Sequence, residues 1–420
     1  MKELTINNSA ASKTKKKKIS LYRKVVIELL RKMQKGYLQI TLPEGDVINI
    51  GEKDQDINAY INIKDNSFFK KVVKFGDVGF GESYVDGDWE TNNITNVISW
   101  MILNIESNPA ISGSKVKFSP ISLLKTFNTI THKFNHNSVI GSKKNISAHY
   151  DLNNDFFKLF LDDSMTYSSG IFAEEDTPLG DAQIEKYDRI CRELKLKEDD
   201  HILEIGSGWG SFAFYAAFFY KCKVTSITIS EEQFKYANDK LAKTKLKKRV
   251  EFKLIDYRKM EGQFDKIVSI EMLEAVGHKY YKDFFAKCNQ LLKKDGAMSL
   301  QVITSHDSRY NELRKGVDWI QKHIFPGSLL PSIGILNKTA NETSNMHIHD
   351  IKNFGLDYGK TLNLWRQKFN KKLEDVKLLG FDDYFVRKWN YYLSYCEAAF
   401  NMRNISVIQV VYTRPNNRNL

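Results

Sequence analysis

The chain has 420 residues, 42% hydrophobic and 27% charged, which is ordinary for a folded protein and long enough for two domains. It contains no apolar run near the roughly 18 residues that a membrane span needs, and no signal-peptide pattern. The four cysteines lie far apart without a Cys-x-x-Cys pair. This spacing argues against a bound metal and fits a reduced cytosolic protein.

The net charge of +12 is concentrated at the N-terminus. Residues 1–40 hold 11 Lys and Arg against two Glu, an excess of nine, so the rest of the chain is nearly balanced. The basic signal therefore belongs to an N-terminal arm and does not imply a groove lined with nucleic acid contacts. Residues 1–18 are polar, end in four lysines, and are expected to be a disordered basic arm.

Apolar residues recur at helical spacing from Leu21 to Met33, with basic residues on the other faces. A basic amphipathic helix beside a lysine run suits an anionic bilayer surface. The same pattern also fits a surface helix that packs on its own domain and leaves its charged face in water. The sequence leaves both interpretations open.

Residues 36–90 contain short alternating strands and a hairpin turn, followed by a glycine-rich and acidic stretch that reads as a turn or a helix start. Residues 93–105 predict an apolar helix, and residues 107–137 a connection between domains. We therefore expect a small α+β domain, associated with lipid or membrane, over residues 19–125. A catalytic domain with insertions for an acyl pocket is expected over residues 126–420.

From residue 202 the chain alternates between apolar strands and helices. Such alternation predicts an α/β fold with a mostly parallel sheet and helices on both faces. Ligands of such sheets bind at the carboxyl ends of the strands. The last hundred residues add aromatic-rich helices, and a final strand near residues 406–414 is expected to pair at the sheet edge. The expected strands of the alternating region are 202–205, 223–229, 250–255, 264–270 and 297–303.

The first of these strands runs into a glycine turn, Gly206-Ser-Gly-Trp-Gly210, and then into a helix. Glycines let the backbone turn sharply and approach a ligand that a Cβ would block. A dinucleotide site would need a further glycine at Ser211, so the motif favours S-adenosylmethionine (SAM) over NAD. Glu204 either reaches the amino acid end of that cofactor or caps the turn. Asp256, at the end of a later strand, either meets the adenine amine or caps a helix.

The acceptor of the methyl group has to be inferred from the rest of the chain. The Asn/Asp-Pro-Pro-aromatic element of amine-methylating enzymes is replaced by Ser269 to Glu274, and no cysteine follows a proline. Both observations weaken a nucleic acid substrate. Apolar and aromatic residues dominate the flanks of the second domain, which favours a hydrophobic acceptor.

Several long motifs resemble one family. They are HYDLNNDFF, MTYSSGIF, LEIGSGWGSFAFYAA, TSITISEEQ, FDKIVSIEMLEAVG and NFGLDYGKTL, spread between residues 148 and 414. In this order they resemble the cyclopropane-fatty-acyl-phospholipid synthases and the related fatty-acid methyltransferases, which include the mycolic acid cyclopropane synthases. The resemblance implies a class I SAM-dependent methyltransferase fold. It also implies that SAM contacts Tyr167, Ser168, Glu204, Gly206, Gly208, Trp209, Gly210, Thr228, Ser230, Gln233, Asp256 and Tyr257.

The resemblance also implies a bicarbonate ion that acts as the base. Its expected partners in this chain are Glu274, Tyr358 and the backbone of Ile303, while Ser169 stands at the family's cysteine position and Gln301 at its histidine position. Both replacements keep hydrogen-bond donors, and neither brings the titratable group that it replaces. The product is therefore open between a ring and a methylene branch. Glu274 also reads as a helix-start cap.

The sequence thus predicts methyl transfer from SAM to the cis double bond of unsaturated acyl chains in membrane phospholipids, giving cyclopropane fatty acids. The alternatives are a methylene- or methyl-branched product, methylation of nucleic acid or another small molecule, and a lipid-binding protein without activity. Expected partners are phospholipids and an anionic membrane surface, without nucleic acid, and the resemblance suggests a homodimer. The expected location is the cytoplasm, at the inner face of the membrane.

Overall fold

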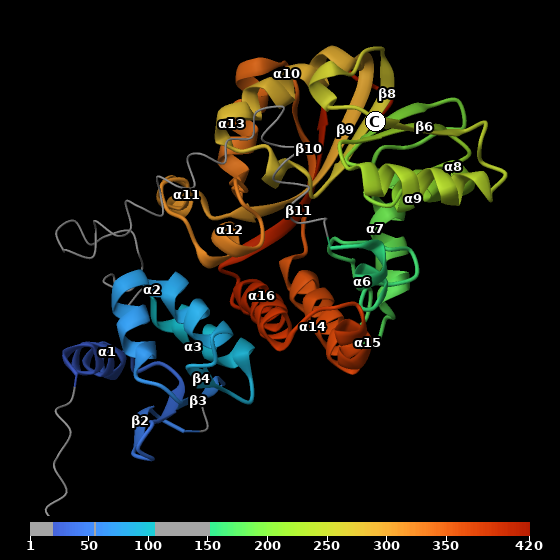
Figure 1. Cartoon of the computed structure of the whole chain (residues 1–420). Helices are drawn as coiled ribbons and strands as arrows, with labels where there is room; N and C mark the ends of the chain where they lie inside the picture. Colours follow the sequence, from blue (N-terminus) through green and yellow to red (C-terminus); the bar gives the residue numbers. More distant parts are fainter. Residues whose placement is uncertain (1–19, 54–55, 106–151) are drawn as a thin grey trace, which may run out of the picture.

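The computed structural model describes residues 20–53, 56–105 and 152–420 (Figure 1). The expected basic arm, the expected connection over residues 107–137 and the boundary placed at residue 125 lie outside these residues. Within them the strands form two separate sheets, one of four strands near the N-terminus and one of seven. No described helix combines the length and the apolar character needed to cross a bilayer.

The N-terminal unit is a four-stranded sheet covered by helices. The strand order is β2-β1-β3-β4, with β1 antiparallel to β2 and parallel to β3. The glycine-rich stretch belongs to one long helix that bends at Gly76, where φ is +59°. The N-terminal unit therefore contains more helix than the sequence predicts. The elements are α1 (Leu21–Arg31), β1 (Tyr37–Thr41), β2 (Val47–Gly51), β3 (Asn58–Ile63), α2 (Ser67–Val85), β4 (Trp89–Glu90) and α3 (Ile94–Ile105).

Helix α1 packs on its own domain. Val26, Ile27 and Leu30 are buried in a core that continues into the sheet. Apolar exposure is confined to the first turn and its neighbour, where Leu21 is 74% and Val25 38% accessible. The interpretation of this segment as a packed surface helix is therefore confirmed, and contact with a bilayer stays a prediction.

The large sheet has the order β10-β11-β9-β8-β5-β6-β7. The five strands from β9 to β7 are parallel, as predicted, whereas β11 and β10 each run antiparallel to their neighbour. The last strand, β11, was expected at the edge, but β10 covers it. The strands are β5 (His201–Ile205), β6 (Lys223–Thr228), β7 (Val250–Leu254), β8 (Phe264–Ile270), β9 (Leu292–Ser305), β10 (His347–Asn353) and β11 (Ile405–Thr413).

Helices lie on both faces of this sheet, and α16 lies against the N-terminal unit with α14 on its other side (Figure 1). Side-chain caps define several of their starts: Asn153 accepts from the amide of Phe156, and Ser230 from that of Gln233. The helices are α6 (Asn154–Lys158), α7 (Leu179–Glu193), α8 (Ser211–Phe219), α9 (Glu231–Ala242), α10 (Tyr281–Leu291), α11 (Asp307–Leu313), α12 (Trp319–His323), α13 (Ile333–Thr343), α14 (Gly355–Lys371), α15 (Leu373–Leu378) and α16 (Asp383–Asn401).

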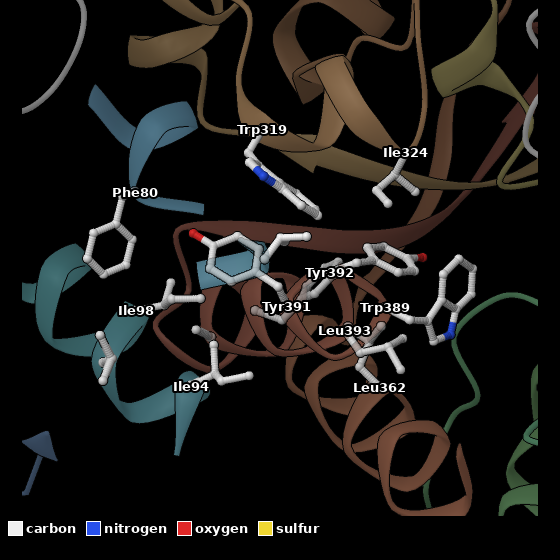
Figure 2. Packing of buried hydrophobic residues seen from close by; sticks show 14 of the residues in the cluster. Phe80, Ile94, Ile98, Trp319, Ile324, Leu362, Trp389, Tyr391, Tyr392 and Leu393 are labelled. Atoms are coloured by element: carbon white, nitrogen blue, oxygen red, sulfur yellow. The ribbon is translucent and has the colours of Figure 1, made fainter. Parts of the chain in front are cut away.

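One hydrophobic core joins the N-terminal unit to the C-terminal helices (Figure 2). Tyr391 of α16 packs edge-on against Trp319 of α12, with 4.7 Å between ring centroids, and stacks on Tyr84 of α2. The guanidinium of Arg387 donates to the carbonyls of Tyr84 and Trp89. The two parts are therefore fastened by a shared apolar interior and by hydrogen bonds from Arg387 to backbone carbonyls of the N-terminal unit.

Candidate active site

The glycine turn connects β5 to α8 at the carboxyl edge of the parallel strands. The amides of Gly206 and Ser207 both donate to the carbonyl of Ile227 on β6, at 2.9 and 3.0 Å. All three glycines of the turn have positive φ values: +96° at Gly206, +49° at Gly208 and +90° at Gly210. These backbone angles strongly favour glycine, which explains the motif in physical terms.

Glu204 points from β5 into the buried region beside this turn. Its carboxyl accepts a hydrogen bond from the Ser226 hydroxyl at 2.5 Å, and only 2% of the residue is accessible. Burial raises the pKa of Glu204 to about 8, against the effect of the Ser226 hydrogen bond. This hydrogen bond comes from a side chain of β6. The interpretation of Glu204 as a cap of the turn, at Ser207 or Ser211, is therefore wrong.

The buried Glu204 should make stability depend on pH. The folded chain keeps this proton between the unfolded pKa near 4.5 and the folded pKa near 8, so the proton favours folding at low pH and the benefit is lost as pH rises. Relative to Glu204→Gln, the SAM-free wild type should lose roughly 3–5 kcal/mol of unfolding free energy between pH 5 and 9, since the linkage spans about three pKa units at about 1.4 kcal/mol each. Urea titrations at several pH values measure this difference.

The exposed Glu232, at the start of α9, provides the control for that titration. Glu232→Gln should follow the wild-type pH dependence. A constant gap between wild type and Glu204→Gln across the range would contradict the raised pKa.

The other residues predicted to contact SAM gather around the same turn. Thr228, Ser230 and Gln233 form a closed set of hydrogen bonds at the start of α9, in which the Thr228 hydroxyl donates to Gln233 Oε1 at 3.1 Å. The indole of Trp209 donates to Asn154 Oδ1 at 2.7 Å. The Tyr167 hydroxyl pairs with that of Tyr392 at 2.6 Å.

Asp256 lies at the far side of this region, and its carboxylate oxygens already have a hydrogen-bond partner. Both of its oxygens accept hydrogen bonds from Arg258, whose charge lowers the pKa of the carboxyl against the effect of burial. Asp256 also caps the short helical turn that begins at Tyr257. The capping interpretation is therefore confirmed, and a contact of Asp256 or Tyr257 with adenine stays a prediction.

A cavity of about 900 Å³ unites these groups. Most residues predicted to contact SAM line it, whereas Gly210 and Ser230 lie behind its wall. From the glycine turn the cavity reaches Tyr358, Tyr392 and Tyr395 of the C-terminal helices, and Phe75 and Val78 of the N-terminal unit. Its size is that of a site for a small molecule and part of a second one.

Glu274 is a buried carboxyl in the wall of this cavity. Oε1 accepts from the amide of Ile303 at 2.5 Å, whereas Oε2 has no partner among the described residues. Burial, and secondarily the charge of Glu271, raises the pKa of Glu274 to about 8. Glu274 is therefore neutral near pH 7, and its carboxyl keeps a proton in the wall of the cavity.

Three of the five predicted anion-binding residues, Ser169, Gln301 and Tyr358, donate to Glu271, a residue to which the sequence assigns no role. Its Oε1 accepts from the amide of Ser169 at 3.0 Å and from Gln301 Nε2 at 2.8 Å. Its Oε2 accepts from the Tyr358 hydroxyl at 2.6 Å. Of these four residues only Glu271 and Tyr358 line the cavity, so Ser169 and Gln301 lie behind the Glu271 carboxylate.

The bicarbonate ion implied by the resemblance does not fit this arrangement. The hydroxyl of Ser169 donates to the Gly170 carbonyl, and the donors of Gln301 and Tyr358 are used by Glu271. A second anion at this place would face an existing carboxylate with few donors left. The prediction that Ser169 and Gln301 donate to a free anion is therefore replaced by donation to a side chain of the protein.

A line of polar side chains fixes the amide of Gln301. Its Oε1 accepts from Gln409 Nε2 at 3.0 Å, which leaves Nε2 directed at Glu271. Gln409 in turn accepts from Arg189, which is paired with Asp350 at 2.6 Å. The Gln301 amide that donates to Glu271 is thus held in its orientation by hydrogen bonds of its own.

Lys186 is a second residue that the sequence analysis misses. Its ammonium is fully buried, donates to the Ser168 hydroxyl at 2.7 Å, and lies in the field of Glu271. Burial lowers the pKa of Lys186 to about 7, against the effect of the nearby carboxylates. The signal for Glu271 was present in the sequence, as an acid directly after a strand of the parallel sheet, whereas Lys186 looks like any charged residue of an amphipathic helix.

The chain is similar to known proteins over most of its length. Residues 137–410 match a family model described as mycolic acid cyclopropane synthetase. The chain is 34% identical to the tuberculostearic acid methyltransferase of Mycobacterium tuberculosis, over 89% of this chain and 87% of that one. It is 36% identical to the cyclopropane-fatty-acyl-phospholipid synthase of Escherichia coli K12, over 85% and 88% of the two chains.

A solved structure shows a similar fold. A mycolic acid cyclopropane synthase complexed with SAH (S-adenosylhomocysteine, which is SAM without its methyl group) and CTAB superposes with a TM-score of 0.60 and 29% identity. The match covers 65% of this chain and 98% of that one.

Proposed function

Because the chain belongs to the mycolic acid cyclopropane synthetase family, we propose that it methylates the cis double bond of unsaturated acyl chains in membrane phospholipids. The chain is a SAM-dependent methyltransferase of the cyclopropane synthase type. The phospholipid acceptor and the cyclopropane product are the proposal.

The SAM site is assigned to the glycine turn and the residues around it. Gly206 and Gly208, both with positive φ, line the cavity and keep the backbone free of Cβ atoms where the cofactor approaches, and Ser207 Oγ is buried without a partner among the described residues. These features fit a bound nucleoside with polar ends. Bound SAM supplies a methyl group on a positively charged sulfur, so the protein needs chiefly to orient it.

The observation that carries the lipid proposal is the continuity of the cavity. It runs from the glycine turn to the N-terminal unit and is walled by apolar side chains such as Phe75, Ile102 and Leu362. An acyl chain needs an apolar channel of this kind. Lys74, Arg309 and Lys315 also line the cavity, and their charges suit a lipid phosphate.

The aromatic residues support the same chemistry. Methylation of a double bond leaves a positive charge on carbon, which aromatic faces stabilise in a dry cavity. Tyr358 and Tyr392 line the cavity, and Tyr358 is held by stacking on Phe400 at 4.5 Å between centroids. Tyr167 is held by stacking on Trp365 at 5.2 Å.

A branched product is the second candidate. The similarity to a protein named tuberculostearic acid methyltransferase, over most of the chain, favours it as a real alternative. Ser169 and Gln301 are the positions that depart from the implied family pattern, and both lie directly behind Glu271. The two candidates share SAM, the acceptor and the cation, and differ in how the cation is discharged.

Labelled SAM tests this proposal. Purified protein incubated with methyl-labelled SAM should transfer label to the fatty acids of vesicles with cis-monounsaturated chains, and not to fully saturated vesicles of the same headgroup. Mild hydrogenation before mass spectrometry separates ring from methylene products, because only the methylene takes up hydrogen under mild conditions. Label in neither vesicle would refute the lipid proposal, and label in saturated vesicles would refute the double bond as acceptor.

A further inference from the structure

Glu271 has an unusual backbone for its side chain. It directly follows β8 with φ at +49°, one of few non-glycine residues with a positive φ among those described. This conformation costs free energy for any residue with a Cβ, and such strain persists where the surroundings enforce it, often at functional sites. Its amide donates to the Gln301 carbonyl at 2.7 Å, which holds the strained residue against β9.

The side chain of Glu271 is held as firmly as its backbone. Three donors from distant segments, Ser169, Gln301 and Tyr358, fix both carboxylate oxygens at 2.6–3.0 Å. The residue nevertheless lines the cavity that contains the glycine turn. A carboxylate that is oriented by its neighbours and open on one side is arranged to accept a proton from a molecule in the cavity.

The charges around Glu271 suit a base. Burial raises its pKa, while the Lys186 ammonium and the three donors favour the charged form. Glu274, its acidic neighbour, has a pKa raised to about 8 and is protonated near neutral pH. Of the two carboxyls in this wall, Glu271 is the one whose oxygens face three hydrogen-bond donors, the arrangement that stabilises a carboxylate, whereas Glu274 faces the single amide of Ile303.

We propose that Glu271 is the built-in base of this enzyme and takes the place of an external bicarbonate ion. This inference rests on the proposed methylation of a double bond. The methylated acyl cation loses one proton: a C–H bond breaks, its electron pair closes the ring or forms the methylene double bond, and the proton passes to a Glu271 carboxylate oxygen. Neutral Glu271 returns the proton to solvent between turnovers.

Turnover without bicarbonate tests this directly. In buffer freed of carbon dioxide, the wild type should label vesicle lipids at the same rate with or without added bicarbonate. Glu271→Gln keeps the shape of the side chain and cannot accept the proton, so its rate should fall at least about 100-fold, within the usual range for a lost general base. Glu342→Gln, on the exposed side of α13, should leave the rate unchanged. SAM affinity measured by calorimetry should stay within about threefold in all variants if only the base is lost.

A smaller residue should reopen the anion site. In Glu271→Gly the donors of Ser169, Gln301 and Tyr358 lose their acceptor, and added bicarbonate or formate should raise the rate at least about tenfold. Binding is read separately, without SAM or lipid, from line broadening of carbon-13-labelled bicarbonate. Glu271→Gly should broaden the signal and the wild type should not.

Three results would overturn the inference. They are a wild-type rate that falls when bicarbonate is removed, a Glu271→Gln rate within a few-fold of wild type, and bicarbonate binding by the wild type. A wild type that never labels lipid refutes the proposed function instead, and the binding measurement then still decides whether Glu271 fills the anion site.

Discussion

Gly206→Ala should weaken SAM binding at least tenfold. At φ of +96° a Cβ costs roughly 1–2 kcal/mol, and the added atom would lie 3.1 Å from the Cβ of Met272. The turn must then shift and carry with it the two amides that donate to Ile227. Since about 1.4 kcal/mol is a factor of ten in affinity, isothermal calorimetry with SAM resolves the effect.

Gly45, in the turn between β1 and β2, provides the matched control. It has the same φ of +96°, and a Cβ there would meet no described atom within 4 Å. Gly45→Ala should therefore bear the backbone strain alone, with slightly lower stability and wild-type SAM affinity. Equal SAM affinity in the two variants would show that the glycine turn does not hold the cofactor.

Gly81→Ala should destabilise the protein by about 1–3 kcal/mol, the usual cost of overpacking. Gly81 lies on α2 where the N-terminal unit meets the catalytic part. A Cβ there would lie 2.5 Å from Trp319 and 2.7 Å from Tyr391, so both rings would have to move. The loss should appear as a lower midpoint in urea unfolding.

Gly180 gives the opposite expectation for the same substitution. It lies in the first turn of α7, and a Cβ there would meet no described atom within 4 Å. Gly180→Ala should stabilise the chain by about 0.5 kcal/mol, because alanine has the higher helix propensity. A Gly81→Ala variant as stable as Gly180→Ala would contradict the close packing of Gly81 against the two rings.

Local signals predicted the parallel sheet and the glycine turn, since both are written in consecutive residues. Strand β10 was missed because His347 to Asn353 lacks apolar alternation, and its place at the sheet edge comes from pairing with β11. Helix α2 was underestimated because glycine is a poor helix former. There the packing of Gly81 against two aromatic rings overrides that propensity.

The candidate site shows the same limit more sharply. The motif containing Glu271 and Glu274 was recognised, and Glu274 received the role that the resemblance implies. What distinguishes the two carboxyls is their partners: Glu271 has donors from Ser169, Gln301 and Tyr358, whereas in the described part of the chain the side chain of Glu274 accepts from the Ile303 amide alone. Such partners come from segments about 30 to 100 residues away, and no local pattern announces them.

The core shared with α16 also constrains how the chain is made. Helices α2 and α3 are complete by residue 105, but α16, which covers them, begins only at residue 383. At roughly 5–20 residues per second, the ribosome needs about 15–55 s to bridge that interval. During this time the first unit lacks Tyr391, the aromatic side chain on which Tyr84 of α2 stacks in the finished protein. The part synthesised first is thus completed last, and truncation before α16 leaves it prone to aggregation.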